Sequence, residues 1–186
     1  MLKKTIIIVA ILSLIGCSAQ KNTTMEKFDI ERFNENKNHL NEFKFIKKDS
    51  TVIEQMELKD IYSEDIIFKD SYFIKKSQYY KNGFLKITGL FFDSSFKQGI
   101  WKEFDEQGKL IKETDYDKGF DYTWEDLVKY LEERKVDIKG RYTTIRKEEG
   151  NWRFSYVEGI YIYDVIIDGK TGKIIQDAKN EFEEGS

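Results

Sequence analysis

The feature that most constrains the fold of this chain is a long alternation of apolar and polar residues that no proline interrupts. Apolar side chains recur at every second position through much of the segment from Phe43 to Tyr116, and the 186 residues include no proline and 15% aromatic residues. Successive side chains of a β-strand point to opposite faces, so this spacing indicates strands. Glycines separate the later strands, at Gly83, Gly89, Gly99 and Gly108. The pattern predicts an antiparallel β-meander.

A helical pattern follows the meander. Thr123 precedes Asp126 by three positions, which is the spacing of a capping box. Apolar residues then lie at helical spacing, at Trp124, Leu127, Val128 and Leu131. We therefore expect an amphipathic helix that ends near Arg134. A shorter helix is expected to begin after Asp29, whose side chain can cap it.

Strand patterns return after the helix, in the runs 142–147, 152–156 and 161–167. A helix followed by three antiparallel strands can enclose a small core. The predicted fold class is therefore α+β, an antiparallel β-meander followed by a helix packed on a small antiparallel sheet. We expect two regions, a mainly antiparallel β region over 25–119 and a helix plus β-hairpin module over 120–186. The acidic tail from Lys179 to Ser186 is expected to fray.

The N-terminus has the composition of a targeting segment. Lys3 and Lys4 precede an apolar run over 5–15, and Gly16 and Cys17 follow it. This order of charge, apolar run and small residue is that of a secretory signal. A membrane-spanning helix is the alternative, but the run is shorter than the roughly 20 residues that such a helix needs.

The end of this segment resembles the lipobox of bacterial lipoproteins, in which the cysteine is acylated and becomes the mature N-terminus. The resemblance implies a signal peptide at 1–16 and a lipidated, polar tether at 17–24, with the membrane bound through lipid on Cys17. Ser18, rather than an acidic residue, follows the cysteine. In some Gram-negative bacteria this fits sorting to the outer membrane, so the expected location is the cell envelope, lipid-anchored and facing the periplasm. Cys17 is the only cysteine, so no intrachain disulfide is expected.

Two further regions, residues 79–119 and 163–174, resemble known modules. Residues 99–110 (GIWKEFDEQGKL) and 116–119 (YDKG) resemble a MORN-like repeat, and residues 79–85 (YYKNGFL) are similar to an earlier, degenerate copy. Such a repeat implies a hairpin in which Trp101 and Phe104 pack and Gly108 turns with a positive φ. Residues 163–174 (YDVIIDGKTGKI) resemble the closing hairpin of PepSY-type domains, which implies binding or inhibition in the envelope.

Composition and motifs argue against several classes of function. The net charge of −3, with both signs interspersed, argues against nucleic acid as a partner. No glycine-rich nucleotide fingerprint and no Gly-x-Ser-x-Gly elbow occurs. His39 is the only histidine and Cys17 the only cysteine, which excludes zinc sites built from several of these residues. We expect no catalytic residue, no metal ligand and no cofactor, and therefore no enzyme.

The remaining class is a protein that binds another protein. Residues 25–34 (MEKFDIERFN), followed by MORN-like strands, resemble the opening of bacterial immunity proteins, which protect a cell from secreted toxins. The resemblance implies a toxin-neutralising lipoprotein whose partner is a secreted toxin. The alternative is a structural or assembly lipoprotein that binds another envelope component. Aromatic, arginine and acidic side chains expected at the surface are the candidate binding residues: Tyr79, Tyr80, Asp115, Asp117, Tyr122 and Arg141.

Overall fold

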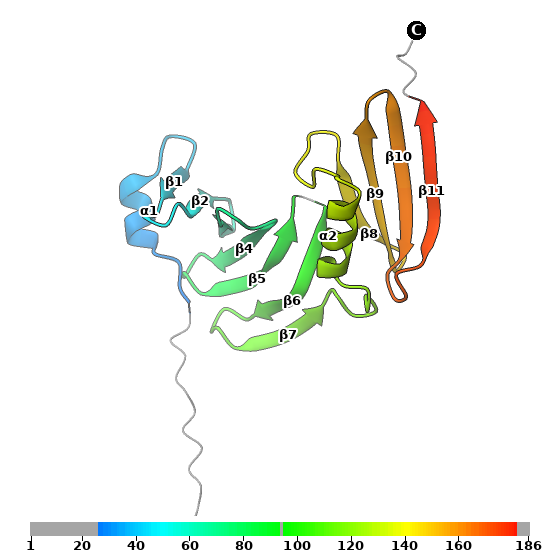
Figure 1. Cartoon of the computed structure of the whole chain (residues 1–186). Coiled ribbons are helices and arrows are strands. Elements are labelled where there is room, and N and C mark those ends of the chain that lie inside the picture. The colour runs from blue at the N-terminus through cyan, green and yellow to red at the C-terminus, as the bar shows by residue number, and fades with distance from the viewer. Residues whose placement is uncertain (1–25, 94, 182–186) are drawn as a thin grey trace, which may run out of the picture.

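The computed structural model describes residues 26–93 and 95–181. These residues form two helices and eleven strands, which are arranged in two antiparallel sheets (Figure 1). The predicted signal peptide, Cys17 and the tether lie outside the described residues. The predicted α+β class, with mostly antiparallel sheet, is confirmed.

The larger sheet is a meander in which each strand pairs with the next along the chain. Its strands are β1 (Glu42–Ile46), β2 (Val52–Glu57), β3 (Ile61–Ile67), β4 (Phe73–Tyr80), β5 (Leu85–Phe92), β6 (Phe96–Phe104) and β7 (Leu110–Asp115). This order confirms the meander that the alternating pattern predicts. The turns follow the glycine signals, since Gly83 and Gly108 have φ angles of 85° and 80° in the β4–β5 and β6–β7 hairpins.

The smaller sheet has the order β11-β10-β9-β8. Its strands are β8 (Thr144–Glu148), β9 (Asn151–Glu158), β10 (Tyr161–Asp168) and β11 (Ile174–Glu181). Three of these strands match the predicted runs. The fourth, β11, overturns the expectation that the chain frays from Lys179 onward, because β11 pairs with β10 as far as Glu181 and residues 179–181 are therefore part of a strand. The backbone of this segment forms its hydrogen bonds with β10. The polar sequence of the segment does not by itself indicate a strand.

Both predicted helices are present, and side chains cap both of them. The Asp29 carboxylate accepts a hydrogen bond from the Arg32 amide at the start of α1 (Ile30–Asn36). Thr123 and Asp126 form a reciprocal capping box at the start of α2 (Trp124–Glu133). Hydrogen bonds from Thr123 hold the pKa of Asp126 below its usual range.

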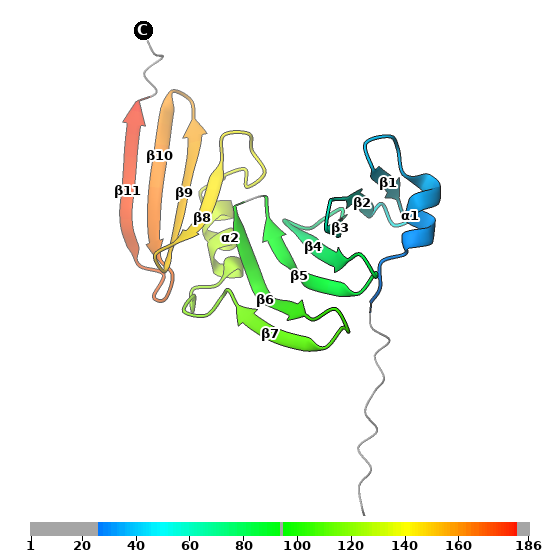
Figure 2. The same ribbon diagram turned by 180° about the vertical axis from the view of Figure 1, so that it is seen from behind.

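The two helices cover opposite ends of one face of the large sheet (Figures 1 and 2). Phe33 of α1 packs against Tyr62 on β3, in a cluster that also contains Tyr79 of β4. Trp124 of α2 packs against Phe73, at the other end of β4. Tyr79 and Phe73 are separated by an even number of residues on one strand, so they lie on the same face.

The main core joins the two sheets across α2. The Trp124 ring lies 5.0 Å from Phe92 on β5, 5.1 Å from Phe73 on β4 and 6.0 Å from Trp152 on β9, measured between ring centroids. Leu127 and Leu131 of the same helix are fully buried in this cluster. One core therefore contains residues from both sides of the boundary expected near residue 119. The division of the chain into two regions stays a prediction.

A lysine from the small sheet completes this junction. Lys147 on β8 reaches the carboxylate of Asp117, which lies just after β7, and also donates to Gln98 Oε1 on β6 at 2.9 Å. Its side chain is only 8% exposed. Three aromatic rings lie 5.0–5.2 Å from the ammonium group, those of Phe96, Phe120 and Trp152. The charge is thus paired and enclosed between the sheets.

Trp124→Ala is expected to lower the free energy of unfolding by about 3–5 kcal/mol, because it removes the ring that contacts both sheets. Leu131→Ala and Trp101→Ala should each cost about 2–5 kcal/mol, since both side chains are buried. Thermal and denaturant unfolding measure these losses. If all three variants melted at the temperature of the parent chain, the assignment of buried faces would be wrong.

Candidate functional site

The structure does not bring the six predicted binding residues together into one site. Tyr79 contradicts the expectation of surface exposure, because it is only 1% exposed and packs under α1 against Phe28. Burial, together with the charge of Glu64, raises its pKa. Adjacent residues of a strand point to opposite faces, so Tyr79 and Tyr80 could not both be exposed once one face was covered.

The other two tyrosines are half-buried, and both hydroxyl groups are engaged within the chain. Tyr80 donates a hydrogen bond to the Phe104 carbonyl at 2.9 Å, and Tyr122 donates to the Asp126 carbonyl at 3.1 Å. The Tyr122 ring also lies over Gly172, where an added Cβ would come within 2.5 Å of it. These contacts give both tyrosines a role within the fold.

The expected acidic face is only partly available. Asp115 is exposed, whereas Asp117 is half-buried and its charge is matched by Lys147. Asp117 also accepts hydrogen bonds from the Gln98 side chain and the Gly99 amide, which fix it against the large sheet, and its ion pair with Lys147 then links the two sheets. Arg141 is exposed in the segment between α2 and β8, where its guanidinium lies 5.4 Å from the Tyr142 ring. The structure thus brings none of the exposed candidates into one cluster.

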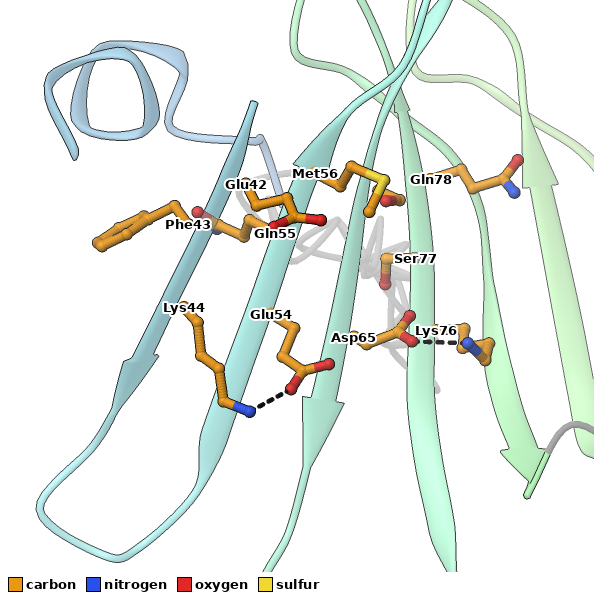
Figure 3. Close-up of a pocket in the computed structure, with 11 residues that line it drawn as sticks. Glu42, Phe43, Lys44, Glu54, Gln55, Met56, Asp65, Lys76, Ser77 and Gln78 are labelled. Carbon is orange, nitrogen blue, oxygen red and sulfur yellow. Dashed lines mark hydrogen bonds and ion pairs between the residues drawn. The ribbon is translucent and has the colours of Figure 1, made fainter. Parts of the chain in front are cut away.

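A more continuous polar surface lies on the face of the large sheet that neither helix covers, which we call the open face. Four charged side chains occupy directly opposed positions on β1, β2, β3 and β4, and we call them the charge row: Lys44, Glu54, Asp65 and Lys76. Lys44 donates to Glu54 at 2.6 Å, and Lys76 donates to Asp65 at 2.6 Å (Figure 3). The signs run positive, negative, negative, positive, so two carboxylates face one another at the centre.

The charge row lies opposite to both helices. Asp65 is three residues from Tyr62 on β3, and Lys76 is three residues from both Phe73 and Tyr79 on β4. An odd separation places side chains on opposite faces of a sheet, so the covered aromatic residues and the charge row cannot share a face. The charge row borders a hollow of about 440 Å³, which Glu42, Met56 and Gln78 also line. Figure 3 shows these side chains together on β1 to β4.

Aromatic residues continue this face beyond β4. Gly89 on β5 is opposite Lys76, and the Trp101 ring lies over this glycine so closely that an added Cβ would come within 2.3 Å of it. Lys97 stacks 4.2 Å from the Trp101 centroid and 4.7 Å from that of Tyr116. The open face therefore combines a charged part over β1–β4 with an aromatic and cationic part over β5–β7.

The charge row leaves no local signal in the sequence, because it depends on the register of the strands. Lys44, Glu54, Asp65 and Lys76 are about ten residues apart along the chain, and nothing in their local sequence distinguishes them from other charged residues. They come together only because four consecutive strands pair with registers that oppose them. A search for charges at matched positions of successive predicted strands would have found this set.

No protein-family model, no curated protein and no solved structure matches the chain. Over the described residues, no helix has the length and apolar character to cross a membrane. In the same part of the chain, no three His, Cys, Asp or Glu side chains are grouped so that they could hold a metal ion. Binding through side-chain hydrogen bonds and ion pairs is the chemistry that the charge row supports.

Lys76→Gln is expected to lower the free energy of unfolding by about 0.5–1 kcal/mol, because Asp65 then faces Glu54 without its own partner. Adding Glu54→Gln should recover most of this loss, since it removes the opposed carboxylate. Urea unfolding of the single and double variants at low salt measures the coupling. Equal losses in the presence and absence of Glu54 would show that the two carboxylates do not interact.

Proposed function

We propose that this chain is a membrane-anchored lipoprotein that acts as a non-catalytic protein-binding module, and specifically as a toxin-neutralising protein of the immunity type. Lipid on Cys17 would hold it to the outer membrane facing the periplasm. The single observation that carries the binding proposal is the open face of the large sheet, where the charge row borders a hollow. The partner would carry the complementary order of charges.

Two features of the open face support protein binding. Neither helix contacts this face, because both pack on the other one. The exposed part of the charge row is held in place by ion pairs, with side-chain exposures of 64% for Lys44 and 43% for Glu54. A preorganised row of this kind loses little conformational freedom on binding, and opposed charges set the register of a partner.

The resemblances to a MORN-like repeat and to a PepSY-like module are part of the same proposal. The hairpin over β6 and β7 has Trp101 packed and Gly108 at positive φ, as a MORN-like repeat would require. Packing of α2 on the four-stranded sheet is the arrangement that a PepSY-like module would have. These features support both resemblances.

A stoichiometric titration tests the proposed function. The purified protein is added to the toxin-like product of a neighbouring gene, and the remaining toxic activity is measured. We expect protection that saturates near one equivalent, because a binder occupies the toxin without turnover. Protection at a small fraction of an equivalent would instead indicate an enzyme. Absence of any complex, together with binding to an envelope component, would favour the alternative of an assembly lipoprotein.

The paired substitution Lys44→Glu with Glu54→Lys tests whether the charge row is the binding surface. It retains an ion pair between β1 and β2 and leaves a lysine opposite Asp65, so folding should be unaffected. The order of charges along the row is nevertheless changed, so binding should weaken at least tenfold while the melting temperature stays the same. Unchanged affinity would exclude the charge row as the binding surface.

Anchoring is tested separately. Cys17→Ser removes the acyl acceptor, so labelled fatty acid should no longer be incorporated and the protein should leave the membrane fraction. The matched control is Ser18→Ala, which keeps the cysteine and should remain labelled. Labelling of the Cys17→Ser protein would contradict the lipoprotein assignment.

A further inference from the structure

Strand β11 is an edge strand of eight residues. It pairs with β10 on one side, and among the described residues no strand pairs with its other side. Figure 1 shows β11 at the outer border of the small sheet, on the side away from β8. Both faces of the strand are largely exposed, with Ile174 at 45% and Ile175 at 57%. An uncovered edge of this length offers backbone donors and acceptors to another strand.

Two opposite charges lie side by side on this strand. Asp177 and Lys179 are two residues apart and therefore point to the same face. Asp177 pairs at 2.6 Å with Arg134, the residue that caps the C-terminus of α2, which identifies this face as the one that carries the helix. Lys179 stacks 3.7 Å from the Tyr161 centroid and forms no ion pair with any described carboxylate. Its charge lacks an anionic partner within this part of the chain.

The charges make the strand complementary to itself in one register. When two copies of β11 pair antiparallel with Ala178 opposite Ala178, Asp177 of each copy faces Lys179 of the other, and Gln176 faces Asn180. Directly opposed pairs of opposite charge stabilise a sheet, and small residues permit close approach at the centre.

The neighbouring registers are disfavoured. If both copies keep their helices on the same face of the joined sheet, the register can shift only so that Asp177 or Lys179 becomes the central residue. Asp177 would then face Asp177, or Lys179 would face Lys179, and like charges directly opposite one another are destabilising. The same residues thus permit one pairing and oppose the two nearest alternatives.

We propose that β11 is a self-association edge through which two copies of this chain form a symmetric dimer, with the two small sheets joined into one sheet of eight strands centred on Ala178. The interface is isologous, since each copy contributes the same strand. Lys179 gains its carboxylate from the other copy. This surface is distinct from the charge row on the large sheet, so self-association and toxin binding can be tested independently.

Cysteine cross-linking of the full-length chain in its membrane tests the register. In the proposed dimer, Ala178→Cys places two thiols opposite one another, and mild oxidation should give a disulfide-linked dimer on a non-reducing gel. Gln176→Cys on the same face of the strand is the matched control and should give none, because it lies opposite Asn180. The double variant Gln176→Cys with Asn180→Cys should cross-link again. The parent chain, which has Cys17 alone, provides the blank.

Charge substitutions test the ion pairs. In the Ala178→Cys background, Lys179→Glu should reduce cross-linking roughly tenfold, because two attractive pairs become repulsive. Lys179→Arg should retain it, and the melting temperature of both variants should match that of the parent. Equal cross-linking of Ala178→Cys and Gln176→Cys would overturn the register. Absence of cross-linking in every variant, with the protein folded and in the membrane, would overturn the dimer.

Discussion

The structure depends on the contact of one helix with two sheets. Trp124 lies at the start of α2, and its ring touches Phe92 on the large sheet and Trp152 on the small one. Aromatic rings bury a large apolar area and pack edge to face at such junctions. Without this helix, the apolar end of the large sheet and the inner face of the small sheet would both be exposed to water.

The polar contacts between the sheets are arranged around the same junction. Lys147 places its charge among three aromatic rings, and Asp117 supplies the matching carboxylate from the other sheet. Removing one member of such a pair would leave a buried charge without a partner, which is far more costly than losing an exposed ion pair. This role explains why Asp117, although it follows an exposed strand, does not contribute a free negative charge to the surface.

Covering one face of the large sheet determines which surface remains for binding. Since α1 and α2 pack at opposite ends of the same face, the other face retains its charged and aromatic side chains. Like charges at Glu54 and Asp65 are directly opposed there, and the lysines that flank them compensate. The proposed binding surface is therefore a consequence of where the helices pack and how the strands are registered.

The sequence by itself determined the local structure. The Thr123 and Asp126 pair identified the start of α2, Gly83 and Gly108 identified the turns of two hairpins, and the alternating pattern identified the meander. These signals are local, because caps, turns and strand periodicity depend on residues that are neighbours along the chain.

Only the tertiary structure decided which face of each strand is covered and which charges meet. Tyr79 was predicted to be exposed and is buried, since alternation defines two faces without saying which one α1 will cover. The charge row required the registers of three strand pairs to align, and the strand structure of β11 required pairing with β10. Burial, register and pairing are set by residues far apart in the sequence, and their energies are fixed only when those residues come into contact.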